Sequence, residues 1–200
     1  MSPRSAAANQ QIRDARRDSL LRAARRVFAR NGLAATRISD IAAEARVSQG
    51  LVYHYVANKE ALFAEIVESA LQETARLAAA SARQSGSAWQ RLECLCERML
   101  TGVREDPEYV LVIMQAFTSA AAPEQARRAI SEYGQQTFAD IIGLIAQGQA
   151  EGSVAAGDPV DAAVAFTACI QGLALARLQA SSGEAAFPRS ETILRLLRAT

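Results

Sequence analysis

The chain is short of the residues on which most catalytic and metal sites depend. Its 200 residues include one histidine, His54, and three cysteines, and no cluster of further ligand-type side chains lies near the histidine. The sequence also has no glycine-rich phosphate loop, no His-Glu metal spacing and no nucleophile elbow. We therefore expect no catalytic residue, no metal site and no cofactor, and we do not expect an enzyme.

Long apolar runs are missing as well. No stretch of about 18 uncharged apolar residues occurs, and the first ten residues lack the apolar core of a signal peptide. Cys94 and Cys96 lie two apart on an expected helix and point in different directions, and Cys169 has no evident partner. These features predict a cytoplasmic protein without a membrane segment, whose cysteines are small buried hydrophobic residues.

Strand-type alternation is absent, and helical periodicity covers most of the chain. Half of the residues are hydrophobic, which is enough for a sizeable core. Breakers such as Asn31-Gly32 and Asp106-Pro107 predict an all-α fold of about nine helices. Residues 1–57 should form an N-terminal arm and a three-helix head, and residues 58–200 a larger helical body. The expected helices are 13–30, two short ones within 36–57, then 58–83, 88–104, 107–119, 124–151, 159–181 and 189–199.

The stretch from residue 36 to residue 60 predicts a helix-turn-helix. Thr36, Ser48 and Asn58 can each cap a helix start, because their side-chain oxygens can accept from unpaired backbone N–H groups. A short middle helix with a polar outer face can enter the major groove of DNA. The formal charge of +1 divides into about +6 for residues 1–60 and −5 for the rest, which suits a DNA contact confined to the head.

Individual roles follow from side-chain chemistry. Gln49 can pair with an adenine edge, Gly50 allows close approach of the backbone, and Leu51 can meet a thymine methyl group. Thr36 and Arg37 are candidates for backbone contacts, and Ser48 and His54 also belong to the expected DNA-facing set. Tyr55 is expected either to pack in the core or to contact a phosphate. Arg4, Arg13, Arg16 and Arg17 could touch DNA as part of a flexible arm, because residues 1–10 are expected to be disordered.

Residues 21–66 closely resemble the DNA-binding segment of the tetracycline-repressor (TetR) family of bacterial transcription regulators. The matching positions run in order through Arg22 to Gly32, Ile41 to Ala45, Val47 to Gly50, Tyr53 to Tyr55 and Lys59 to Phe63. The resemblance implies that Tyr53 and Lys59 hold the DNA backbone. It also implies a homodimer that binds a double-stranded operator, a small-molecule effector in each body, and repression relieved by that effector.

Three positions depart from the usual family pattern. Arg46 stands where a glycine is common, in the turn between the two motif helices, where a positive φ would cost a non-glycine residue about 1–2 kcal/mol. We expect Arg46 to reach DNA or an acidic neighbour such as Glu44. Leu51 replaces a small or hydroxyl residue, and Val56 replaces a phenylalanine, which should only trim the core of the head.

The body offers two expected surfaces. A cavity for a mainly apolar effector would be lined by a subset of the aromatic and flexible apolar side chains that recur at helical spacing in the body. Most of these side chains would instead belong to the hydrophobic core. The resemblance places the dimer contact in the helices at 159–181 and 189–199, where small and apolar residues form a seam. The effector candidates are Trp89, Met99, Tyr109, Ile113, Met114, Phe117, Tyr133 and Phe138, and the dimer candidates are Val164, Ala168, Gly172, Leu173, Ala176, Leu194 and Leu197.

The most favoured function is therefore a ligand-released homodimeric repressor that reads a pseudo-palindrome. A second possibility is an activator, or a DNA-binding regulator that uses no ligand. An enzyme built on the helical body, and an interaction module that has lost DNA binding, remain as further alternatives. Arg46 is the single feature that favours the last of these.

Overall fold

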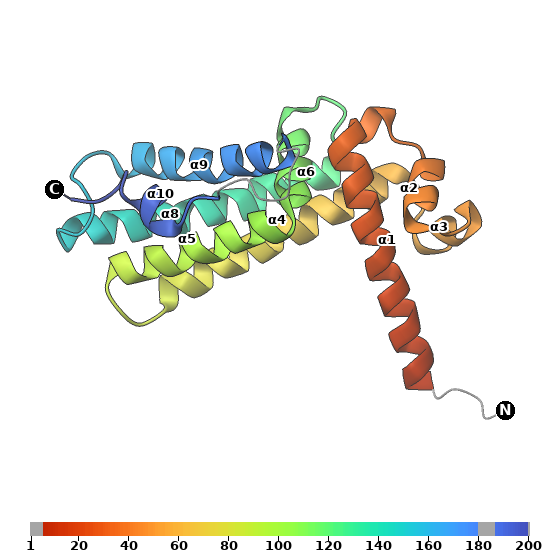
Figure 1. Ribbon diagram of the computed structural model, residues 1–200, viewed down its shortest axis with the longest axis horizontal. Helices are drawn as coiled ribbons and strands as arrows, with labels where there is room; N and C mark the ends of the chain where they lie inside the picture. Colours follow the sequence, from red (N-terminus) through yellow and green to blue (C-terminus); the bar gives the residue numbers. More distant parts are fainter. Residues whose placement is uncertain (1–5, 180–186, 200) are drawn as a thin grey trace.

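A computed structural model describes residues 6–179 and 187–199, and every regular element in these residues is helical apart from one isolated bridge between Val154 and Arg198. Figure 1 shows an elongated body with a small head at one end. The predicted all-α class is confirmed. The helices are α1 (Ala6–Ala35), α2 (Ile38–Ala45), α3 (Gln49–Tyr55), α4 (Lys59–Arg83), α5 (Ala88–Glu105), α6 (Pro107–Thr118), α7 (Glu124–Ala129), the π-helical η1 (Ile130–Gly134), α8 (Gln135–Ala150), α9 (Pro159–Gln179) and α10 (Ser190–Leu194).

Most helix boundaries follow the predicted breakers. Gly32 has φ 74° and ψ 165°, so α1 is interrupted at the predicted Asn31-Gly32 stop. The side chains of Ser48 and Asn58 cap α3 and α4 as expected, each accepting from a backbone N–H three residues ahead. Helices α7, η1 and α8 join without a break, because the residues between them keep helical φ and ψ. The π-helical turn adds one residue to a turn of this long helix, and sequence periodicity gave no sign of it.

Two ends of the chain differ from the prediction. Helix α1 begins at Ala6, so residues 6–10 are helical, while Arg4 lies outside the described residues. At the other end, α10 spans five residues, and the chain then turns and pairs with the segment after α8. Val154 and Arg198 form the bridge there, and Ala155 N–H donates to the Leu197 carbonyl at 2.9 Å. The predicted helix 189–199 is therefore wrong in length.

Helix α1 lies across the end of the body and belongs to the cores of both parts (Figure 1). Its buried side chains Leu20, Val27 and Phe28 share one hydrophobic cluster with residues of α2, α3, α4, α6 and α7. A second cluster fills the far part of the body between α5, α8, α9 and α10. The hydrophobic core therefore continues across the expected head–body boundary at residue 57.

A polar joint also ties α1 to the body. The buried guanidinium of Arg25 pairs with the Asp106 carboxylate at the α5–α6 junction and lies 3.6 Å from the centroid of the Tyr109 ring. One turn further along α1, the Ala29 carbonyl accepts from the Gln115 side chain at 3.1 Å. The head is thus attached to α6 as well as to the long helix α4.

The pH dependence of stability should report on this joint. Burial of the Asp106 carboxyl raises its pKa to about 6, while Arg25 acts against that rise. An aspartate in the unfolded chain has a pKa of about 3.9, so the folded protein binds this proton more tightly. The free energy of unfolding of the wild type, relative to Asp106→Asn, should therefore increase as the pH falls from about 6 to about 4. Urea unfolding of both proteins across this range measures the difference. A flat difference would mean that Arg25 keeps the carboxylate ionised throughout.

Candidate DNA interface

The turn between α2 and α3 depends on Arg46. This residue adopts φ 56° and ψ 44°, and it is the one described non-glycine residue with a positive φ. Its backbone N–H donates to carbonyls at the end of α2, and the Val47 N–H donates to the Ala42 carbonyl at 2.9 Å. The left-handed conformation predicted for this position is therefore present, and it ends α2 in the way a glycine normally would.

Helix α3 presents a polar face that the chain itself does not cover. Val52 is fully buried and fixes the inner face, so Gln49, Gly50, Tyr53 and His54 are left exposed on the outside. A Cβ atom built at Gly50 would meet only the Ser48 hydroxyl, at 4.0 Å, so no packing within the chain requires a glycine there. The space beside Gly50 is open for an external molecule. Base contacts by these residues remain a prediction.

Leu51 has a different position. It lines a pocket between α3 and α1 and is partly buried there, on the flank of α3 that faces α1. It therefore does not share the outward face with Gln49 and Tyr53. The contact of Leu51 with a thymine methyl group stays a prediction.

Thr36 is not available to DNA, which corrects its predicted role. Its side chain is fully buried, and its hydroxyl donates to the Gly32 carbonyl at 2.7 Å. The position that caps α2 is instead Arg37, whose backbone N–H donates to the Asp40 carboxylate at 2.9 Å. The physical reason is the early stop at Gly32, which leaves a carbonyl that Thr36 satisfies. The side chain of Arg37 is exposed and remains a candidate for a backbone contact.

Lys59, the one lysine of the chain, is also used internally. Its ammonium group donates to the carbonyls of Leu33, Ala34 and Thr36, at distances of 2.9, 3.1 and 2.8 Å. An ammonium group has three protons, so these bonds use its full donor capacity. A phosphate contact of the Lys59 side chain would require at least one of these bonds to open, and it stays a prediction. The signal that could have revealed this role is the run of unpaired carbonyls that must follow a helix stop.

One carboxylate near the turn, that of Glu44, pairs with two arginines of α1. Glu44 accepts from Arg26 at 2.7 Å and also pairs with Arg30, and these two hydrogen bonds hold the pKa of Glu44 below its usual value. The expected pairing of Arg46 with Glu44 is therefore wrong, because α1 already occupies that carboxylate. The side chain of Arg46 is exposed, and its contact with DNA stays a prediction.

The candidate effector residues do not gather at one place. Tyr109, Ile113 and Tyr133 pack against the cluster that contains α1, whereas Trp89, Met99 and Phe138 pack against the far cluster. Met114 is partly buried and Phe117 is 56% exposed. A single cavity lined by all eight residues is therefore excluded. Neither of the two pockets described for this chain is lined by any of them.

The candidate dimer residues divide into an exposed group on α9 and a buried group near the C-terminal end of the chain. Val164, Ala168, Gly172 and Ala176 are exposed along one face of α9, and Leu173 is partly buried beside them. Leu194 and Leu197 are at most 5% exposed, since the short α10 and the turn after it fold back onto α5 and α9. These two leucines belong to the core of the single chain, and their assignment to the interface is corrected.

Comparison with protein-family models gives two matches. Residues 20–66 match the model described as bacterial regulatory proteins of the tetR family. Residues 88–199 match the model of the BetI-type transcriptional repressor, C-terminal. The second match covers more than half of the chain.

The chain is also similar to individual transcriptional regulators. An uncharacterized HTH-type transcriptional regulator, YfiR, of Bacillus subtilis is 27% identical over 140 residues, which is 70% of this chain and 66% of YfiR. The HTH-type transcriptional regulator BetI of Agrobacterium fabrum is 28% identical over 127 residues, 64% of this chain and 62% of BetI. The matched segments thus span less than two thirds of the length of these relatives. The structure of the MbdR regulator from Azoarcus sp. CIB has the same fold, with a TM-score of 0.77 at 22% identity, covering 92% of this chain and 98% of MbdR.

Replacing Arg46 by glycine should stabilise the protein. Glycine adopts the left-handed conformation without the Cβ clash, so Arg46→Gly should raise the free energy of unfolding by about 1 kcal/mol. The matched control is Arg37→Gly, because Arg37 is also exposed but has an extended backbone. That variant should change the free energy of unfolding by less than about 0.5 kcal/mol, because glycine is well tolerated at a helix N-cap and offsets the added freedom of the unfolded chain. Urea unfolding compares the two, and a loss of stability in Arg46→Gly would contradict the assigned strain.

Removing the ammonium group of Lys59 should destabilise the head. Hydrogen bonds from a charged group contribute about 1.5–3 kcal/mol, so Lys59→Met should lower the free energy of unfolding by about 2 kcal/mol. Arg76→Met on the same helix is the control, since its side chain is 73% exposed and makes only a surface ion pair with Glu73. Thermal and urea unfolding measure both changes. Equal stability of the two variants would show that the three carbonyl contacts contribute little.

Proposed function

This chain belongs to the tetR family of bacterial regulatory proteins, with a BetI-type C-terminal region, and on that premise we propose that it is a homodimeric repressor of transcription. The proposed repressor binds a pseudo-palindromic DNA operator in the cytoplasm and is released by a small, mainly apolar effector. Two heads about one DNA turn apart would read the two half-sites.

The outward face of α3 is the observation that carries the DNA-binding part of the proposal. Gln49, Gly50, Tyr53 and His54 are exposed together, and each of their types has a known use against base edges or phosphates. Helices α1 and α2 position this face, because Val52 of α3 packs in one buried cluster with Ile41 of α2 and Phe28 of α1. A short helix presented in this way fits the major groove.

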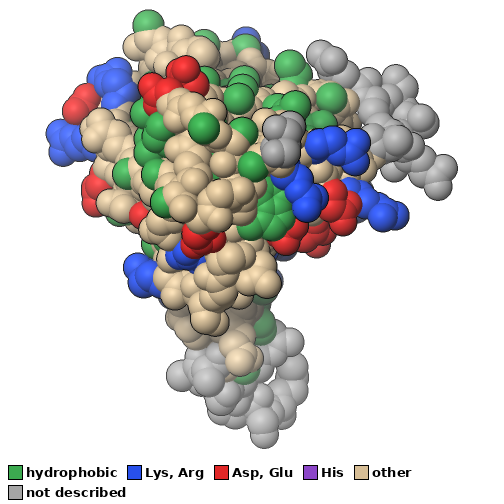
Figure 2. Space-filling view, turned by 90° about the vertical axis from the view of Figure 1, so that its left-hand side faces the viewer, with side chains coloured by type: hydrophobic (Ala, Val, Ile, Leu, Met, Phe, Trp, Pro, Cys, Tyr) green, Lys and Arg blue, Asp and Glu red, His purple; other side chains and the backbone are tan. Residues whose placement is uncertain are grey.

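An exposed apolar face on α9 supports the dimer. The helical segment 159–177 has a mean hydropathy of 1.5, which by length and composition alone would be enough to cross a membrane. Only 22% of this apolar segment is buried within the chain, so most of it is left uncovered. Figure 2, a view of the end of the molecule opposite the head, shows hydrophobic side chains exposed over its upper part. Val160, Val164 and Leu175 are each more than 40% exposed on this helix. A second copy of the chain would cover such a face, as the family resemblance implies.

The pair of helices in the proposed dimer differs from the pair expected from the sequence. Because α10 has five residues, the last two long helices are α8 and α9. They pack on each other, and α8 also exposes small residues at Ala139 and Ala146. We therefore assign α8 and α9 of each copy to the four-helix contact, with α10 serving the core of its own chain.

Effector release would act through the joint at the end of the body. Helices α4 and α6 both contact α1. Helix α6 does so through Tyr109 and Gln115, and Asp106, the residue before α6, pairs with Arg25. A small molecule bound between these helices would shift α1 and with it the spacing of the two heads. Tyr109, Ile113 and Tyr133 are the candidates nearest this joint, since they pack against the cluster that contains α1.

DNA binding and its release are tested together by a gel-shift assay with DNA flanking the protein's own gene. The proposal expects a shifted band, and expects compounds that raise the melting temperature of the protein to remove the shift. A shift that no stabilising compound removes would favour the alternative, a regulator that uses no ligand. The absence of any shift would contradict the proposed function.

A charged residue on the α9 face should abolish the dimer. Ala168→Arg places a charge in the middle of the proposed contact, so the protein should become monomeric and its affinity for a palindromic duplex should fall at least about 100-fold. Ala80→Arg is the control, because Ala80 is exposed on α4, away from α9 (Figure 1). Sedimentation velocity measures the mass of each species. A dimeric Ala168→Arg variant with wild-type affinity would rule out this face.

A further inference from the structure

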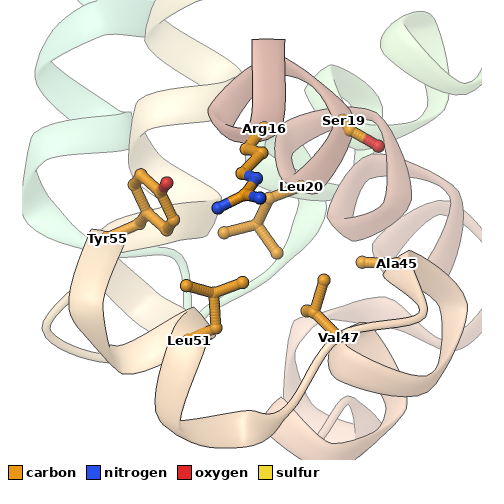
Figure 3. A pocket seen from close by; sticks show the side chains of 7 residues that line it. All are labelled: Arg16, Ser19, Leu20, Ala45, Val47, Leu51 and Tyr55. Atoms are coloured by element: carbon orange, nitrogen blue, oxygen red, sulfur yellow. The ribbon is translucent and has the colours of Figure 1, made fainter. Parts of the chain in front are cut away.

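A pocket of about 280 Å³ lies in the head between α1 and α3. Its apolar surface comes from Leu20, Val47 and Leu51, and its polar groups come from Arg16, Ser19 and Tyr55. Figure 3 shows the Arg16 guanidinium extending over Leu20 and Leu51 toward Tyr55. Arg16 and Ser19 are exposed, so the pocket opens to solvent beside α3.

The charge of this pocket is not neutralised within the described residues. Four other arginines of α1 each pair with a carboxylate: Arg17 with Glu65, Arg25 with Asp106, and both Arg26 and Arg30 with Glu44. Arg16 makes no such pair in the described part of the chain, and no carboxylate lines the pocket. The Arg16 guanidinium and the Tyr55 hydroxyl can both donate hydrogen bonds from the same side of the pocket, which suits an anion.

From this geometry we infer that the pocket seats one sugar–phosphate unit of the DNA backbone, with Arg16 contacting the phosphate and the apolar surface contacting the sugar. The inference rests on the proposed DNA-binding function and names a contact of that same interface. It gives the N-terminal part of α1, which precedes the segment matched to the family model, a direct role in binding.

The position of the pocket favours a DNA strand. The major groove is about 12 Å wide and a helix with its side chains is about 10–12 Å across, so groups on the flanks of an inserted helix face the two phosphate chains. Leu51 and Tyr55 lie on the flank of α3 that faces α1, and Arg16 closes the same side. A strand that runs along this flank would place a phosphate between Arg16 and the Tyr55 hydroxyl.

The salt dependence of DNA binding tests the contact. Phosphate contacts do not depend on sequence, so a duplex of about 30 base pairs of arbitrary sequence serves as the probe beside DNA flanking the protein's own gene. Affinities of the wild type and of Arg16→Ala are measured by fluorescence anisotropy between about 50 and about 300 mM salt. Arg16→Ala should weaken both complexes about fivefold near 150 mM salt, and it should reduce the slope of log K against log salt by about 0.9.

Arg22→Ala is the matched control. Arg22 is an exposed arginine of the same helix that lies outside the pocket, so its removal should leave the slope unchanged. Arg16→Lys should retain the wild-type slope, because it keeps the charge. Equal melting temperatures would show that all the variants are folded.

Three results would overturn the inference. If the wild type binds DNA and Arg16→Ala has the same slope as Arg22→Ala, the phosphate contact is absent while the proposed function stands. If octanoate raises the melting temperature of the wild type but not of Arg16→Ala, the pocket takes a free amphipathic acid instead of DNA. If the wild type binds neither duplex, the proposed function and this inference both fail.

Discussion

The burial of the second half of α1, from Leu20 onward, between the head and the body is the constraint on which the rest of the structure depends. Phe28 of α1 meets Phe63 of α4 edge to face, with ring centroids 5.2 Å apart, and both rings are almost fully buried. The same helix supplies Leu20 and Val27 to the core of the head. Helix α1 shares one cluster with α3 and packs on α6, and α6 in turn packs on α9, so α1 and α6 together connect α3 to α9. A regulator that works through the distance between two heads needs a connection of this kind.

Local signals explain why so much of the fold could be predicted. Gly32, Ser48 and Asn58 each act on neighbouring backbone groups, so their roles in ending or starting helices follow from the sequence alone. The left-handed conformation of Arg46 was predicted from the family resemblance, because a glycine is common at this position of the turn. The polar outer face of α3 followed from helical periodicity.

The contacts that the sequence did not predict join residues far apart in the chain. Lys59 binds carbonyls more than twenty positions before it, and nothing local distinguishes that role from a phosphate contact. Leu194 and Leu197 have the spacing of an interface helix, but the chain turns after α10 and buries both in its own core. The aromatic residues of the body look equivalent in sequence, yet packing assigns them to two separate clusters. In each case the deciding factor is the path of a loop or the packing of a neighbouring helix, which periodicity does not record.

The central claim is that two heads, fixed by α1 and joined through α9, read two halves of one DNA site. Hydroxyl-radical footprinting on the DNA that flanks the protein's own gene tests this claim most directly. The account predicts protection of two half-sites of related, inverted sequence, with centres about one helical turn, or about 10 base pairs, apart or a small multiple of that distance. A single protected patch without a second half-site, or no protection at protein concentrations that saturate non-specific binding, would contradict it.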